Sequence, residues 1–201
     1  PDANCKDGGV RYSTQAWNDV NLGKMNENDL TSIDQIATAR AAGVGAPGTT
    51  DFDIRIARDG AWFYRGTPIN RKPLVKLFST VLRCDADGVF WLQTPVERGR
   101  IIVEDAPFTA VEVNAVGTGK DQVVTFRTNL DAMVTVDDDH PIFVTFDSKT
   151  DEPSPYVTVR DNLNALILRA VFYELVELAE ECDGVLGVWS QGAFYRLGSV
   201  E

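Results

Sequence analysis

The sequence is poor in the residues that most often carry catalysis or hold metals. Its 201 residues include one histidine, His140, and three cysteines, Cys5, Cys84 and Cys182, none of which belongs to a C-x-x-C pair. Cysteines so few and so widely spaced indicate a reducing compartment, and they disfavour a disulfide framework or a zinc site. We therefore expect a cytoplasmic protein.

Further absences narrow the class of protein. No apolar run approaches the roughly 20 residues that a membrane-spanning helix needs, and the first residues lack the order of a secretory signal. The patterns G-x-S-x-G, H-E-x-x-H and G-x-x-x-x-G-K-[ST] do not occur. We expect no membrane partner, no cofactor and no enzymatic activity. A hydrolase whose triad assembles in space stays open as an alternative.

Basic residues are scarce overall but unevenly placed. The net charge of −11 disfavours a duplex-DNA partner, because neutralising phosphates requires clustered Lys and Arg. Residues 51–100 carry 9 basic and 6 acidic side chains, whereas residues 101–201 carry 6 basic and 18 acidic ones. This difference predicts two units with different surfaces. Either the two halves attract one another, or the basic half offers a pocket for a small anion.

Apolar periodicity predicts the order of the elements in the first half. Residues 1–50 are interpreted as a polar tail, a helix over 28–43 and a Gly-rich linker. Residues 51–100 form the first predicted unit. In it we expect a hairpin that turns at Asp59-Gly60, a short helix capped by Asn70 with Pro73 in its first turn, and a strand after the turn at 85–88.

Residues 101–201 form the second predicted unit, which is rich in strands. Turn signals recur every 8–12 residues up to about residue 160, which is typical of an antiparallel sheet. A helix is predicted over 162–182 because of its apolar stripe, and Gly184 is expected to end it. A hairpin around Gln191-Gly192 closes the chain. The two halves repeat a similar order of elements, which predicts an α+β fold of two duplicated units.

The stretch "TVDDDHPI", residues 135–142, offers three carboxylates beside the only imidazole. Calcium loops space their carboxylates at alternating positions around a glycine, whereas these aspartates are adjacent. Pro141 also biases His140 towards an extended backbone. We interpret the stretch as an acidic turn before the next strand, with a metal or catalytic site as the alternative.

Four arginines are candidates for binding an anion, because one lies on the polar face of its predicted strand and three lie at the ends of predicted elements. Arginine's planar fork suits carboxylates and phosphates, so these side chains either form ion pairs with nearby aspartates or bind an anionic ligand. Trp62, Tyr64 and Trp189 could supply stacking surfaces. The arginines in question are Arg55, Arg71, Arg127 and Arg160.

Four blocks of the sequence also resemble an uncharacterised bacterial family, domain of unknown function 1285. They are "DIRIARDGAWFYRGTPINRKPLVKLFSTVLR", "TFRTNLDAMVTVDDDHPIFV", "PYVTVRDNLNALILRAVFYELVELA" and "LGVWSQGAFYRLG", which lie in this order between Asp51 and Gly198. The resemblance implies a duplicated α+β arrangement whose second unit is superficially similar to a pleckstrin-homology-like fold. It also implies a signalling or ligand-binding role at the interface between the units, and it implies no established reaction.

These observations lead to one main functional hypothesis. We expect a cytoplasmic binding or regulatory module that holds a small anionic ligand, such as a nucleotide or another signal, between its two units. The alternative is a protein-interaction module that uses an exposed sheet edge or the aromatic strand around Trp189. The candidate ligand-binding residues within the matching blocks are Arg55, Asp59, Trp62, Arg71, Arg127, His140, Arg160 and Trp189.

Overall fold

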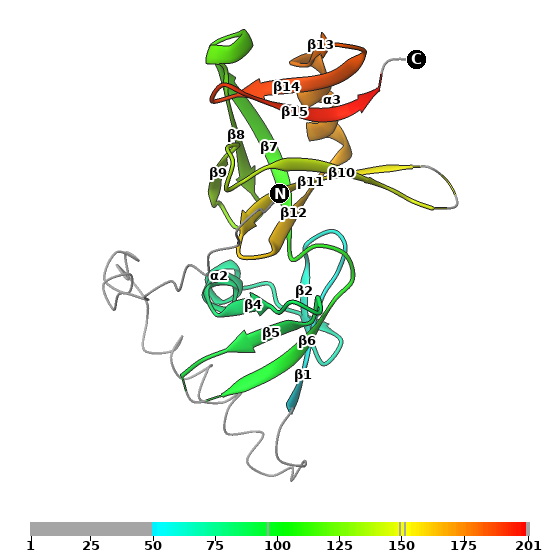
Figure 1. The fold of residues 1–201 in the computed structure, drawn as a ribbon. Coiled ribbons are helices and arrows are strands. Elements are labelled where there is room, and N and C mark those ends of the chain that lie inside the picture. Colours follow the sequence, from blue (N-terminus) through cyan, green and yellow to red (C-terminus); the bar gives the residue numbers. More distant parts are fainter. Residues whose placement is uncertain (1–49, 96, 149, 151, 200–201) are drawn as a thin grey trace, which may run out of the picture. The chain divides into compact units, whose positions relative to one another are not determined.

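The computed structural model describes residues 50–95, 97–148, 150 and 152–199. The helix predicted over 28–43 lies outside these residues, as does all of the linker except Thr50. Within them the chain forms two six-stranded sheets, a smaller three-stranded sheet and two α-helices (Figure 1). This confirms the predicted α+β class.

The first sheet is built from two antiparallel meanders. Its strand order is β3-β2-β1-β6-β5-β4, in which only the central pair, β1 and β6, is parallel. Helix α2 (Lys72–Thr80) connects the two meanders. The strands are β1 (Thr50–Ile56), β2 (Trp62–Tyr64), β3 (Thr67–Pro68), β4 (Leu82–Cys84), β5 (Phe90–Gln93) and β6 (Arg98–Val103).

The second sheet repeats this topology strand for strand. Its order is β10-β11-β12-β7-β8-β9, and again only the central pair, here β12 and β7, is parallel. Read from its own first strand, each sheet therefore has the order 3-2-1-6-5-4, which supports the predicted duplication. The strands are β7 (Phe108–Val116), β8 (Val123–Thr128), β9 (Met133–Thr135), β10 (Ile142–Phe146), β11 (Pro153–Arg160) and β12 (Leu163–Ile167).

The helices do not occupy equivalent places in the two repeats. Helix α2 lies between the third and fourth strands of the first sheet, whereas α3 (Arg169–Glu177) follows the sixth strand of the second. The third sheet comes after α3 and consists of β13 (Glu180–Cys182), β14 (Val185–Ser190) and β15 (Ala193–Ser199).

The helix predicted over 162–182 is wrong in most of its length. The chain first forms β12, then the nine-residue helix α3, and then β13. Strand β12 lies between β11 and β7 in the middle of the sheet. A strand that is buried on both faces has a continuous run of apolar residues, which periodicity alone cannot distinguish from a buried helix. The residues before it, Asp161 and Asn162, both have positive φ, as a two-residue hairpin turn requires. Gly184 likewise belongs to the turn between β13 and β14 and ends no helix.

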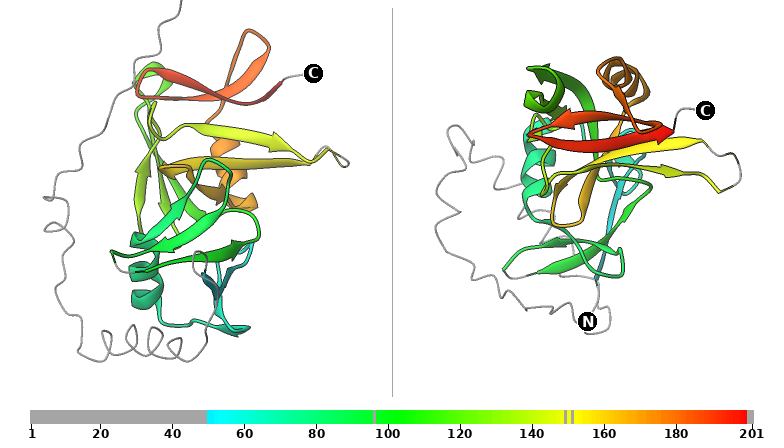
Figure 2. Two further views of the ribbon diagram at one scale, coloured as in Figure 1. Left: turned by 60° about the horizontal axis from the view of Figure 1, so that its bottom comes forward. Right: turned by 45° about the horizontal axis from the view of Figure 1, so that its top comes forward.

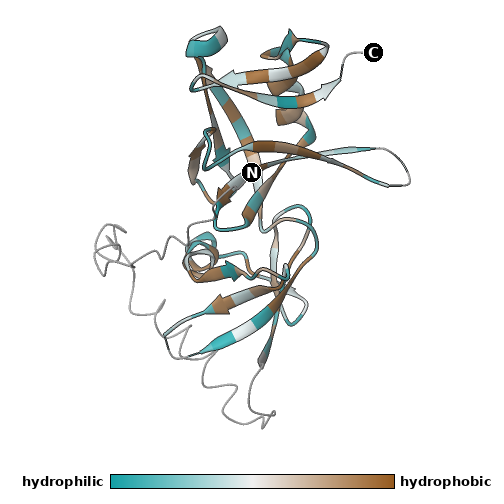
Figure 3. Cartoon of the chain, in the orientation of Figure 1, coloured by the Kyte–Doolittle hydropathy of each residue, from teal (hydrophilic) through white to brown (hydrophobic). Residues whose placement is uncertain are grey.

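Burial follows the alternation of the strands. In β8, the side chains of Val124, Phe126 and Thr128 are buried while those between them are half-exposed. Figure 3 shows the same alternation of hydrophobic and hydrophilic positions along several strands. In the first sheet, the side chains of Ile56 in β1 and Trp62 in β2 are buried.

Helix α2 also agrees with its sequence pattern. Val75 and Phe78 are buried, and proline lies in the first turn, as predicted. The N-cap residue is Arg71 and not Asn70, and its side chain makes no capping hydrogen bond. Neither described helix is long and apolar enough to cross a membrane.

Candidate functional site

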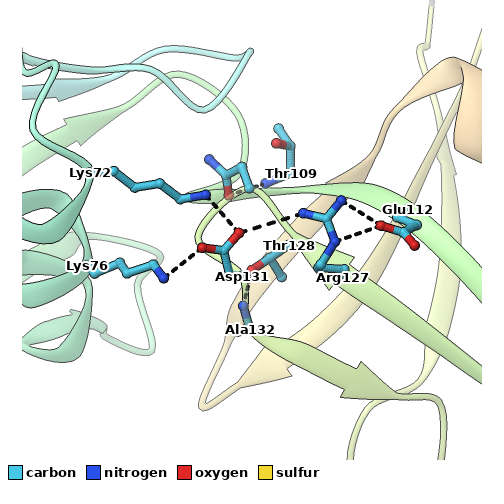
Figure 4. Close-up of polar contacts among 9 residues, drawn as sticks. Lys72, Lys76, Thr109, Glu112, Arg127, Thr128, Asp131 and Ala132 are labelled. Carbon is cyan, nitrogen blue, oxygen red and sulfur yellow. Dashed lines mark hydrogen bonds and ion pairs between the residues drawn. The ribbon is translucent and has the colours of Figure 1, made fainter. Parts of the chain in front are cut away.

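A short loop between β8 and β9 projects a carboxylate towards α2. Asp131 has a φ of +63°, a left-handed conformation that Asp tolerates better than most residues. The loop is fixed by hydrogen bonds from the Asp131 amide to the Thr128 carbonyl (2.9 Å) and from the Ala132 amide to Thr128 Oγ1 (3.0 Å). The position of the Asp131 carboxylate is therefore set by a built turn (Figure 4).

Three cationic side chains surround this carboxylate. Lys72 Nζ lies 2.7 Å from Oδ1 of Asp131, and Lys76 Nζ lies 2.7 Å from Oδ2. The two lysines stand one helical turn apart on α2, so both reach the same group. An Arg127 Nη lies 3.6 Å from Oδ1. Hydrogen bonds from Lys72 and Lys76, with the charges of both lysines, lower the pKa of Asp131 to about 2.

Arg127 connects this cluster to a second carboxylate. Its Nε donates to Glu112 Oε2 at 2.7 Å, and the two residues face each other across the β7–β8 ladder. We call the five side chains the Asp131 cluster, and it consists of Lys72, Lys76, Glu112, Arg127 and Asp131. Three cations and two carboxylates leave one excess positive charge. All five side chains are between 39% and 55% exposed, so the cluster is open to solutes.

The opposite end of α2 is held by Arg160. Its guanidinium donates to the Ser79 carbonyl in the last turn of α2 and lies 5.6 Å from the centre of the Phe108 ring. Burial, and secondly the charge of Arg83, lower the pKa of Arg160 below its usual value. An anion near the beginning of α2 and a cation at its end both complement the helix dipole. The second sheet thus contacts α2 at both ends with charges of the favourable sign.

A neutral contact accompanies these charged ones. Asn129 Nδ2 donates to the Gly60 carbonyl at 3.3 Å, and Asn129 Oδ1 accepts from the Thr109 amide at 3.3 Å. Gly60 belongs to the β1–β2 loop of the first sheet, so Asn129 connects this loop with β7. Asn129 and Asp131 are two positions apart in the β8–β9 loop. This one loop of the second sheet therefore makes both the contact with Gly60 and the contact with the lysines of α2.

Of the predicted residues, only Arg127 lies in the Asp131 cluster, and Arg160 lies at the other end of the same helix. Arg71 is the N-cap residue of α2, next to Lys72. Arg55 instead pairs with Glu104 and lies over the Phe63 ring.

The two predicted tryptophans are in different surroundings. Trp62 is only 2% exposed and packs near Phe78 with ring centres 6.2 Å apart, so it offers no stacking surface to a ligand. Trp189 contacts Phe194 and Lys120, 5.1 and 5.2 Å from its ring centre, beside the 3₁₀ turn η2 (Gly119–Asp121).

Asp59 and His140 have local structural roles. Asp59 Oδ1 accepts a hydrogen bond from the Ala61 amide, 2.9 Å away, and so stabilises the β1–β2 loop. Asp137 accepts from both the amide and Nδ1 of His140 at 2.9 Å, and these contacts lower the pKa of Asp137. The "DDDH" stretch lies in the loop between β9 and β10, as predicted. Among the described residues, no three acidic, His or Cys side chains are grouped to hold a metal ion.

Sequence reasoning missed four members of the Asp131 cluster, namely Lys72, Lys76, Glu112 and Asp131. The spacing of Lys72 and Lys76 could have marked one polar face of the predicted helix. Their partner could not be found in this way, because Asp131 follows Lys72 by 59 positions and becomes its neighbour only in the folded chain.

Comparisons with known proteins agree on one family. The N-terminal domain model of the proteins of unknown function DUF1285 matches residues 46–106, and the C-terminal domain model matches residues 107–197. No curated protein matches the chain.

Two crystal structures are similar to this one. A DUF1285 family protein from Silicibacter pomeroyi DSS-3 shares 44% identity over 82% of this chain and 95% of its own, with a TM-score of 0.73. A second, from Shewanella baltica OS155, shares 26% identity over 63% of this chain and 91% of its own, with a TM-score of 0.50. The two domain models together cover most of the chain, which therefore belongs to the DUF1285 family.

Proposed function

We propose that the protein is a non-catalytic regulatory module that binds a small anion at the Asp131 cluster. The observation that carries the proposal is the convergence of Lys72, Lys76 and Arg127 on one carboxylate. Asp131 occupies the place that a phosphate or carboxylate group of a ligand would take. A phosphate group offers three acceptor oxygens, so it would contact all three cations more completely than a carboxylate does.

Binding at this place would act on the contact between the two sheets. Asp131 and Asn129 hold the first half of α2 and the β1–β2 loop, while Arg160 holds the end of α2. An anion that displaces Asp131 would release one end of α2 and leave the other end held. A ligand shifts an equilibrium between two conformations only if it binds one of them more tightly. Here the anion would bind the conformation in which Asp131 has left the lysines more tightly than the one in which Asp131 holds them.

The wider role we propose is signalling in the bacterial cytoplasm. The ligand would be a nucleotide or another phosphorylated signal, and the second half would serve as a pleckstrin-homology-like scaffold that presents Asp131 and Arg127. The excess positive charge of the cluster, in a protein of net charge −11, supports a role in selecting anions.

The proposal is tested by removing the negative charge of Asp131, which leaves Lys72, Lys76 and Arg127 without this internal partner. We expect Asp131→Asn to bind pyrophosphate and ATP severalfold more tightly than the wild type in isothermal titration calorimetry, because the internal competitor has lost its charge. The double variant Lys72→Ala/Lys76→Ala should lose this binding. Asp51→Asn is the matched control, because Asp51 also pairs with an arginine, Arg100, but within the first sheet on the β1–β6 ladder.

Two results would overturn the proposal. One is the absence of binding of either compound to both the wild type and Asp131→Asn. The other is equal tightening by Asp131→Asn and Asp51→Asn, which would show that only the net charge of the protein matters.

A further inference from the structure

Strand β11 continues past the end of the strand beside it. The β11–β12 ladder ends at Tyr156, although β11 already begins at Pro153. The chain leaves this ladder after β12, because the Leu168 amide donates to the Ala110 carbonyl of β7 and α3 then follows. Figure 2 shows the β10–β11 hairpin (yellow) extending beyond the rest of the second sheet in both views. Among the described strands, the first residues of β11 therefore pair with β10 on one side and with no strand on the other.

Two prolines lie at this unpaired side of β11. The Asp147 amide donates to the Glu152 carbonyl, so the main chain of Glu152 and of every second residue after it faces β10. The main chain of Pro153 and Pro155 consequently faces the other side, where proline has no N–H to donate. Prolines at such positions prevent a further strand from pairing. The space beside the start of β11 is thus closed to a strand but open to a small molecule.

A pocket of about 400 Å³ occupies this space. It lies between the start of β11, the end of β12 and the first two turns of α3, and its lining is more apolar than polar. This volume falls within the roughly 300–1,000 Å³ of small-molecule sites. The walls belong to paired strands, a helix and two prolines, so the pocket exists before a ligand binds. Its apolar lining consists of Pro153, Pro155, Leu166, Ile167, Leu168 and Phe172.

One arginine of the pocket lacks a carboxylate partner. Arg169 begins α3, and its Nε donates to the hydroxyl of Tyr173, 2.8 Å away and one helical turn further on. Among the described residues, no carboxylate lies within ion-pair distance of Arg169, and Glu152, also in the lining, acts on it only at longer range. The other arginine of the lining, Arg58, already pairs with Asp105 at 3.0 Å. Tyr173 therefore holds Arg169 at the pocket and leaves both of its Nη groups for a ligand.

We propose that this pocket, the α3 pocket, binds a small carboxylic acid that has an apolar body. The carboxylate accepts hydrogen bonds from the Nη groups of Arg169, and the apolar body lies against the prolines, Leu168 and Phe172. A single arginine without a partner matches a single negative charge, so a carboxylate suits the site better than a phosphate group does. The volume suits one aromatic ring or a chain of about six to ten carbons. The α3 pocket shares no residue with the Asp131 cluster, so this inference is independent of the proposed function.

The test follows the backbone amide resonances of the isotope-labelled full chain by NMR while octanoate is added. We expect saturable shifts at Arg169, Phe172 and Tyr173. Octanol has the same chain without the charge, and acetate has the same charge without the chain. Each should bind at least about tenfold more weakly than octanoate, because one loses the charged hydrogen bonds and the other loses the apolar contacts. These comparisons leave the protein unchanged, so they cannot fail through misfolding.

Variants of the protein then locate the carboxylate. Arg169→Gln should weaken octanoate binding about fivefold or more and leave octanol binding unchanged, because only the carboxylate contacts the guanidinium group. Arg196→Gln is the matched control, because Arg196 of β15 is also exposed, forms no ion pair with a described residue and loses the same charge. Three results would each overturn the proposal. They are the absence of shifts at the start of α3, binding of octanol or acetate as tight as that of octanoate, and equal effects of the two variants.

Discussion

Replacing Gly60 with alanine should destabilise the protein through the contact between its two sheets. Gly60 has a φ of +83°, and a Cβ atom there would lie 2.5 Å from Asn129 Nδ2 and 3.3 Å from Thr109 Oγ1. The left-handed backbone costs an L-residue roughly 1 kcal/mol. Moving the Asn129 amide also gives up its bonds to the Gly60 carbonyl and the Thr109 amide, at about 1 kcal/mol each.

We therefore expect Gly60→Ala to lose about 3 kcal/mol of unfolding free energy, which lowers Tm by roughly 6–12 °C for a chain of this length. Guanidinium chloride unfolding, followed by tryptophan fluorescence, measures the free energy. Gly192→Ala is the matched control, because Gly192 has the same φ of +83° but no atom within 4 Å of its Cβ position. It should lose only about 1 kcal/mol.

The difference between the two glycine variants isolates the contact with Asn129. In an Asn129→Ala background, where the obstructing amide is absent, Gly60→Ala should cost no more than Gly192→Ala does. Equal losses for the two variants in the wild-type background would refute the reasoning, because they would leave backbone strain as the whole effect.

Three further predictions concern charges and buried groups. The pKa of Asp131 is lowered from 3.8 to about 2, so its contribution to stability is complete above pH 3.8 and is lost as the pH falls through 2. The stability difference between the wild type and Asp131→Asn in urea unfolding should shrink over that window. Ser190→Ala should cost about 2 kcal/mol in denaturant unfolding, because the buried hydroxyl donates to Val136 and accepts from the Val124 amide. Arg160→Met retains an apolar stem but loses the bond to α2 and the contact with an aromatic ring, so calorimetry should show a loss of about 1–2 kcal/mol.

The sequence predicted the fold best for strands that have one buried and one exposed face, because their apolar residues then recur at every second position. The alternation of Ile54 and Ile56 with charged residues identified β1, because this strand has one buried face. The same reasoning failed for Leu163–Ile167, whose strand is buried on both faces and shows no alternation. Only the turn residues Asp161 and Asn162 carried a signal for a strand there, and it was weaker than the helical stripe.

The candidate site was predicted less well because its geometry depends on distant contacts. Arginines at strand ends were a sound guide for Arg127 and Arg160, which do contact the region around α2. Trp62 was chosen as a stacking surface, and its burial in the first sheet follows from the position of α2, which no local pattern specifies. Asp131 was overlooked because an aspartate in a turn is common, and its importance comes from two lysines of the other repeat.

The unequal placement of the helices gives the duplicated fold its asymmetry. Both sheets have the same strand order, but α3 packs against β7 and β14 within its own half, whereas α2 is contacted at both ends by residues of the second sheet. A symmetric duplication would bury each helix in its own repeat and leave no element shared between them. Because α2 is the helix that contacts both sheets, and because its beginning is held by exposed charges, a change in charge at Asp131 acts on one end of one helix. Under the proposed function, the contact between the sheets would respond to an anion at this end of α2 without disturbing either core.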